Sequence, residues 1–136
     1  MHCKLLQCCQ HYTHICWEKL QIRGGGLAVV VSDRLKVRPL NLHFKPTTFE
    51  LQSLIVYTTP PVLLVNIYQP CSPPSTAFFL ELDQLLASAV VERSESLILC
   101  GDFNCPGDNG QSVSDGLDEV LVSSGLEQHV RQPTRG

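Results

Sequence analysis

A carboxylate and an amide stand two residues apart at the end of an apolar run, in the segment SLILCGDFNCP (96–106). A short apolar run bounded by Gly101 and Pro106 predicts a strand that is buried on both faces. Asp102 is expected where this strand leaves the sheet, because an unpaired charge in the middle of the strand would be strongly unfavourable. Asp102 and Asn104 would then project to the same side. Together they could hold a water molecule and a phosphate oxygen.

Ordinary turn chemistry explains the same motif, because Asp and Asn cap turns through local backbone hydrogen bonds. A second segment, Asn66-Ile67-Tyr68-Gln69-Pro70, also ends an apolar run and favours a functional role. If the two strands are neighbours, Tyr68 and Asp102 project from one edge of the sheet, where a tyrosine hydroxyl could contact a phosphate. Half-buried packing of Tyr68 is the alternative that remains open.

Hydrophobic patterns predict the elements that must position these residues. Apolar or alternating runs predict strands, and a helix is predicted where apolar residues recur at a period near 3.6. The strands are expected at 12–17, 27–31, 35–37, 49–58, 62–68, 97–100 and 126–130. A helix of about four turns is expected from Ser75 or Thr76 to Val90, and a shorter one over 117–121 ends at Gly125.

The connections between these elements limit the topology. Residues 59–61 are too few for a parallel crossover, so 49–58 and 62–68 should form an antiparallel hairpin. The long helix lies between the Tyr68 strand and the Asp102 strand, which could therefore be parallel neighbours. The fold class expected is α/β, a partial two-layer β-sandwich that is mostly antiparallel and flanked by helices. An irregular tail is expected at 1–11 and the domain at 12–136.

Composition narrows the classes of function. The chain has 136 residues, 43% of them hydrophobic, and a net charge of -3, so one globular domain without a general basic surface is expected. Any affinity for DNA would come from local residues such as Arg131 and Arg135. The three glycines at 24–26 lead into a β-branched run rather than a helix, which argues against a phosphate-binding loop.

Seven cysteines and the absence of a signal-like or membrane-spanning stretch indicate an intracellular chain with free thiols. Four of the cysteines and three histidines lie in the first sixteen residues. Their spacing matches no common zinc motif, so no metal site is expected among them.

Four segments occur in a fixed order: RGGGLAVVV, NIYQP, LILCGDFNCP and QPTRG, with a predicted helix before the third. This set resembles the endonuclease/exonuclease/phosphatase superfamily, and within it the apurinic-type endonuclease domain of non-LTR retrotransposons. The resemblance covers about residues 12–136. It implies a DNase I-like fold, DNA as partner, an intracellular and potentially nuclear location, and hydrolysis of a phosphodiester that depends on Mg²⁺.

The resemblance also implies roles for individual residues. Asp102 would activate or orient the attacking water, and Asn104 would bind that water or the scissile phosphate. Tyr68 would contact the phosphate, and Thr134, in QPTRG, would lie on the substrate side. We therefore expect Asp102 and Asn104 to be catalytic and Tyr68 and Thr134 to bind substrate.

Several family features are missing from the sequence. In the family, strands before the glycine segment carry an Asn and the main metal-binding Glu; Glu18 is too close to the glycines to be that residue, and Glu50 lies on a later strand. After QPTRG the family continues to an Asp-bearing strand and a Ser-Asp-His, for which His129 is no substitute. We expect a fragment that lacks the main Mg²⁺ ligand, is inactive alone and self-associates through exposed sheet edges.

Other functions remain open at this point. The chain could be a catalytically dead interaction module that pairs through a sheet edge, or a decayed element without a selected function. A phosphatase or a sphingomyelinase-like phosphodiesterase of the same superfamily is a further alternative. RGGGLAVVV and QPTRG argue against the last of these, because they resemble the retroelement branch.

Overall fold

The computed structural model describes residues 4–9, 12–16, 26–70, 73–92, 96–107 and 114–132. These residues form two sheets and two helices. The elements are β1 (Lys4–Cys9), β2 (Tyr12–Cys16), β3 (Ala28–Ser32), β4 (Val37–Pro39), β5 (Glu50–Val56), β6 (Val62–Tyr68), α1 (Thr76–Glu92), β7 (Leu97–Asp102) and α2 (Asp115–Ser123).

The strands are arranged in a three-stranded sheet, β1-β2-β3, and a four-stranded sheet, β4-β5-β6-β7. Every neighbouring pair is antiparallel except β6 and β7, which are parallel and are joined through α1. The predicted hairpin between β5 and β6 and the predicted crossover from β6 to β7 are both confirmed. The α/β fold with a mostly antiparallel sheet is confirmed as well.

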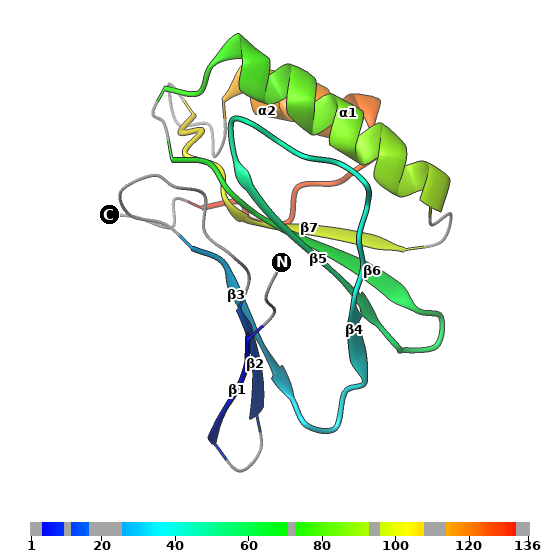
Figure 1. Cartoon of the computed structure of the whole chain (residues 1–136). Helices are drawn as coiled ribbons and strands as arrows, with labels where there is room; N and C mark the ends of the chain where they lie inside the picture. The colour runs from blue at the N-terminus through cyan, green and yellow to red at the C-terminus, as the bar shows by residue number, and fades with distance from the viewer. Residues whose placement is uncertain are drawn as a thin grey trace.

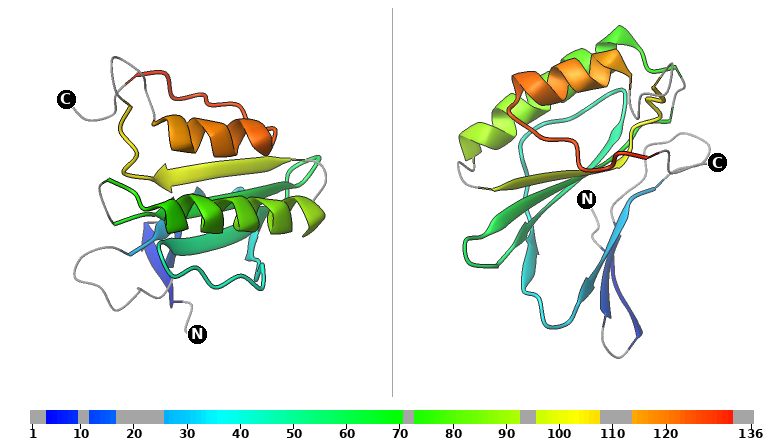
Figure 2. Two further views of the ribbon diagram at one scale, coloured as in Figure 1. Left: turned by 90° about the horizontal axis from the view of Figure 1, so that it is seen from above. Right: turned by 180° about the vertical axis from the view of Figure 1, so that it is seen from behind.

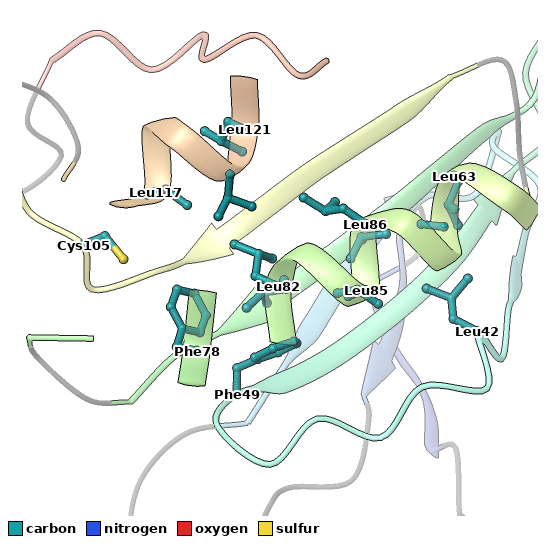
Figure 3. Packing of buried hydrophobic residues seen from close by; sticks show 14 residues of the cluster. Leu42, Phe49, Leu63, Phe78, Leu82, Leu85, Leu86, Cys105, Leu117 and Leu121 are labelled. Atoms are coloured by element: carbon teal, nitrogen blue, oxygen red, sulfur yellow. The ribbon is translucent and has the colours of Figure 1, made fainter. Parts of the chain in front are cut away.

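Both helices cover one face of the four-stranded sheet, and the three-stranded sheet lies on its other side (Figures 1 and 2). Apolar side chains fill the space between the helices and the four-stranded sheet (Figure 3). This core contains Leu42, Phe49, Leu63, Val65, Ile67, Phe78, Leu82, Leu85, Leu86, Ala89, Cys105, Leu117, Val120 and Leu121. The sheet face that carries Tyr68 and Asp102 is the opposite one, because Ile67 alternates with Tyr68 along β6.

Local hydrogen bonds cap the helices: the cap at Ser75 and the stop at Gly125 were predicted, and the cap at Ser114 was not. The Ser75 hydroxyl accepts a hydrogen bond from the Phe78 amide at 3.2 Å at the start of α1. Ser114 caps α2, and the helix ends just before Gly125, whose φ is +70°. Each cap satisfies a backbone group that the helix itself leaves without a partner.

The clearest differences between the predicted and observed strands are in β7, residues 126–130 and β4, while β3 and β5 differ only by one or two residues at their ends. β7 is not buried on both faces: Ile98 is 49% exposed, because it lies on the edge strand of the sheet and on the face away from the helices. Residues 126–130 form no strand, since the Leu126 amide donates to the Leu121 carbonyl at 2.8 Å and continues the end of α2. β4 begins two residues later than expected, because the Leu35 amide bonds the Ser32 carbonyl and holds Leu35 in the turn.

The N-terminal residues also differ from the expected irregular tail. Lys4–Cys9 forms β1 and pairs antiparallel with β2, with Lys4 opposite Cys16. This segment has no alternating pattern of its own, so its pairing partner rather than local propensity makes it a strand. The predicted strand 12–17 is observed as Tyr12–Cys16, and Trp17 lies outside the described residues.

Candidate active site

Tyr68 and Asp102 are neighbours across the parallel strands β6 and β7 and are the last residue of each strand. Directly paired residues point to the same face of a sheet. The prediction that both project from one sheet edge is therefore confirmed. Both side chains are half-buried, so a substrate at this edge can reach them.

Main-chain and side-chain hydrogen bonds join the two strand ends beyond this pair. The Gln69 amide donates to the Asp102 carbonyl at 2.9 Å. Asn104 donates twice: its side-chain Nδ2 to the Gln69 carbonyl at 2.6 Å, and its backbone amide to Asp102 Oδ1 at 3.1 Å. Asn104 has a φ of 47°, a left-handed conformation that Asn tolerates better than most residues. The Asp102 carboxylate is thus oriented by the turn that follows it.

Gly101 lets β7 come close to β6 immediately before Asp102. Its φ is +133°, and a Cβ at this position would overlap the backbone carbonyl of Ile67. Only glycine combines this backbone conformation with so close an approach. The Gly-Asp pair in the motif therefore has a steric reason in addition to a chemical one.

These contacts define the chemistry that remains possible at the edge. An ionised Asp102 carboxylate can only accept hydrogen bonds. It can therefore orient a water molecule or take a proton from that water. The Tyr68 hydroxyl can donate to a phosphate oxygen. One Asn104 Nδ2–H is engaged with Gln69, while Oδ1 remains an acceptor suited to water. The three groups can therefore serve a water molecule and a phosphate at the same time.

Cys105 lies next to this edge and is buried. Burial raises the pKa of its thiol to about 11; the negative charge of Asp102 acts in the same direction, and a hydrogen bond with Ser114 opposes both. The thiol also donates to the Phe103 carbonyl at 3.0 Å. A thiol in this state packs rather than attacks, because only the thiolate is a strong nucleophile.

Three residues were expected near substrate or DNA at the C-terminal end: Arg131, Thr134 and Arg135. Thr134 and Arg135 are outside the described residues, so the role of Thr134 stays a prediction. Arg131 is exposed and forms an ion pair with Glu127 at 3.7 Å. His129 is exposed.

Sequence reasoning missed two residues at this edge. The backbone of Gln69 forms hydrogen bonds with the Asp102 carbonyl and the Asn104 side chain. The only sequence signal for this role is its position in the NIYQP segment. Glu50 is the register partner of Tyr68 on β5 and is buried. Its signal in the sequence is a charge at the first position of an apolar strand.

The described residues do not fit a complete metal site. Among them, no group of three or more His, Cys, Asp or Glu side chains could hold a metal ion. Asp102 provides one carboxylate, and a hard cation such as Mg²⁺ requires several oxygen ligands. The side chains of the N-terminal Cys/His cluster lie outside the described part of the structure.

Among the described helices, none is long and apolar enough to span a bilayer.

Comparison with curated proteins and with solved structures gave no match. Residues 4–135 match the model of the endonuclease/exonuclease/phosphatase family, whose members generally depend on divalent metals, and the fold is consistent with its DNase I-like architecture. The chain therefore belongs to the endonuclease/exonuclease/phosphatase family and forms a hydrolase domain of the nuclease and phosphatase type.

Proposed function

We propose that this chain is part of a DNA endonuclease of the non-LTR retrotransposon type, and that the edge formed by Tyr68, Asp102 and Asn104 binds a phosphodiester. The observation that supports the proposal best is the register of Tyr68 with Asp102 at the ends of adjacent parallel strands. A proton acceptor and a phosphate-binding hydroxyl then share one edge. The four retroelement-like segments support the choice of DNA over a small phosphate ester.

In the proposed reaction, water attacks phosphorus, the bond to the leaving oxygen breaks, and that oxygen takes a proton from solvent. Asp102 orients the water and accepts its proton, which is general base catalysis. Tyr68 donates to a non-bridging oxygen of the phosphate, and the second Nδ2–H or the Oδ1 of Asn104 contacts the phosphate or the water. Positioning of both reactants would provide much of the rate, because the hydrogen bonds at Gln69 fix the two strand ends.

The family resemblance implies Mg²⁺ as the cofactor, which would stabilise negative charge on the phosphoryl oxygens when bound. The described residues contain no group of three metal-ligating side chains. We therefore expect this stretch on its own to cleave DNA at or near background when Mg²⁺ is supplied. Thr134, in the proposed role, contributes to the substrate side.

Binding and cleavage should be tested separately. The binding test is an NMR titration of the chain with thymidylyl-thymidine, a single phosphodiester, in the presence of Mg²⁺. The expected result is chemical-shift change centred on Tyr68, Asp102 and Asn104. Loss of the Tyr68 hydroxyl in Tyr68→Phe should weaken binding about 3- to 10-fold, the effect of one hydrogen bond. Tyr57→Phe, at an exposed tyrosine beyond β5, is the matched control.

If the dinucleotide causes no chemical-shift change at this edge, or causes changes centred elsewhere, the proposed site is contradicted. The cleavage test is nicking of supercoiled plasmid by the chain and by Asp102→Ala. Nicking that this substitution abolishes would show that the site works in this stretch alone, and the expected inactivity would be wrong. Asp118→Ala, at an exposed acidic residue on α2, controls for the change in net charge.

A second candidate function is an interaction module, favoured by the exposure of Ile98. This side chain is 49% exposed on β7, on the face that points away from the helices. Self-association through that face would bury it. Sedimentation velocity should then show a dimer that Ile98→Lys dissociates and that Val122→Lys, on α2, leaves intact. A monomer at all concentrations would exclude self-association through this face.

A further inference from the structure

Glu50, Tyr68 and Asp102 form one row across three adjacent strands. Glu50 pairs with Tyr68 between β5 and β6, and Tyr68 pairs with Asp102 between β6 and β7 (the strands lie side by side in Figure 1). Paired residues share a face, and in an antiparallel pair their Cβ atoms are about 5 Å apart. Glu50 is therefore the direct neighbour of Tyr68 on the side away from Asp102.

Glu50 is a carboxylate that is only 5% exposed. Its Oε2 accepts a hydrogen bond from the Gly26 amide at 2.9 Å. Gly26 has a φ of +112° and lies two residues before β3. The contact thus joins the start of β3, in the three-stranded sheet, to the row that contains Tyr68. A buried carboxylate is costly unless it is hydrogen-bonded, so this bond is important for keeping Glu50 in place.

The next row on the same face is also polar and hydrogen-bonded. Gln52, Asn66 and Cys100 occupy corresponding positions on the three strands. Asn66 Nδ2 donates a hydrogen bond to Gln52 Oε1 at 3.4 Å. The Cys100 thiol donates to Asn66 Oδ1, with 3.9 Å between sulfur and oxygen. This second row lies in the same register as the first, two residues further along each strand. The polar surface beside the candidate site therefore extends across β6 to β5.

We propose that Glu50 is a positioning residue for Tyr68, an inference that rests on the proposed phosphate-binding role of Tyr68. The Gly26 amide anchors the carboxylate on one side, and the anchored side chain limits the positions of the tyrosine ring next to it. The hydroxyl is then held toward the Asp102 side of the edge. Glu50 itself contacts neither the water nor the phosphate.

The test compares Glu50→Ala and Glu50→Gln with the parent chain, and uses Glu119→Ala, at an exposed glutamate on α2, as the control for charge. Three signals are recorded by NMR: the Gly26 amide, the ring resonances of Tyr68 and Tyr57 after ¹³C labelling, and binding of thymidylyl-thymidine. Glu50→Ala should shift the Gly26 amide and the Tyr68 ring, leave Tyr57 unchanged, and weaken binding about 3- to 10-fold.

Glu50→Gln should restore most of the parent signals, because its amide oxygen can accept the same hydrogen bond. Unchanged Tyr68 resonances in Glu50→Ala, together with a shifted Gly26 amide, would overturn the proposal and leave Glu50 a purely structural role. If Glu50→Ala does not fold, Glu50→Asp replaces it, since the shorter side chain keeps its charge but loses reach to Gly26. In that variant an unchanged Tyr68 ring likewise overturns the proposal.

The two proposals can fail separately. A parent chain that shows no binding of the dinucleotide at Tyr68 contradicts the proposed function. The Tyr68 ring signal still reports whether Glu50 positions it, because that measurement needs no ligand.

Discussion

The side-chain amide of Asn104 donates a hydrogen bond to the main-chain carbonyl of Gln69, with 2.6 Å between Nδ2 and O. This bond links the turn after β7 to the residue that follows Tyr68 at the end of β6. Asn104 therefore has a structural task at the same position where the family resemblance implies a catalytic one. Stability and function can be separated there by choosing the substitution.

Asn104→Ala should lower the free energy of unfolding by about 2 kcal/mol. One part is the lost hydrogen bond, and the other is the left-handed φ of 47°, which alanine adopts unfavourably. Asn104→Gly loses the bond but accepts the backbone conformation, so it should cost only about 1 kcal/mol. Urea unfolding of both variants measures the difference, and equal stabilities would show that the backbone conformation contributes nothing.

Gly101→Ala should destabilise the chain by about 3 kcal/mol or more, because the new Cβ would overlap the Ile67 carbonyl at a φ of +133°. Gly125→Ala is the matched control: its φ is also positive, at +70°, but the space around it is open. That variant should cost about 1 kcal/mol. Urea unfolding distinguishes the two, and similar losses would mean that the close approach of β7 to β6 is not what requires Gly101.

Glu81 on α1 fastens the loop before β5. Its carboxylate accepts hydrogen bonds from the backbone amides of Thr47 and Thr48 at 2.9 to 3.1 Å, and from both hydroxyls. Burial alone would raise the pKa of Glu81, but the bonds from Thr47 and Thr48 outweigh it and hold the pKa below its ordinary value of 4.5. The loop carries Phe44 and Phe49, whose rings pack together.

A lowered pKa means that ionised Glu81 stabilises the folded state. This contribution is present above pH 4.5 and is lost as the pH falls through the lower pKa of the folded chain. Glu81→Gln should cost about 1 kcal/mol at pH 7, a modest value because the site is partly exposed, and should flatten the loss of stability in acid. Urea unfolding from pH 7 to pH 3 checks this, with Asp83→Asn, exposed on the same helix, as control. An acid limb that Glu81→Gln leaves as steep as before would contradict the assignment.

Cys105 should react slowly with iodoacetamide in the folded chain. With a pKa of about 11, only about a thousandth of the thiol is ionised at pH 8, and burial limits access further. Peptide mapping by mass spectrometry should show labelling of Cys105 that is fast in urea and slow without it. Asp102→Asn removes a nearby negative charge that raises this pKa, so it should speed labelling. Fast labelling of Cys105 in the folded parent chain would contradict the burial.

Local sequence pattern was enough to predict the parts of the site that lie next to one another along the chain. The apolar run before Gly101 and Asp102, and the helical period from Phe78 to Ala89, follow from local pattern, and local pattern is what backbone propensity and side-chain burial act on. The helix between the two strands even predicted that Tyr68 and Asp102 would be neighbours, because a crossover of that length favours parallel pairing.

The distant residues that join that edge could not be predicted in this way, because the three-dimensional packing of the strands brings them there. Glu50 comes beside Tyr68 through the register of β5, and its bond to Gly26 spans 24 positions of sequence. Lys4–Cys9 is a strand because β2 pairs with it, and Ile98 is exposed because β7 is an edge strand and Ile98 faces away from the helices. Register, pairing partner and the covering of a sheet face depend on contacts between remote segments, and these contacts leave no periodic signal in the sequence.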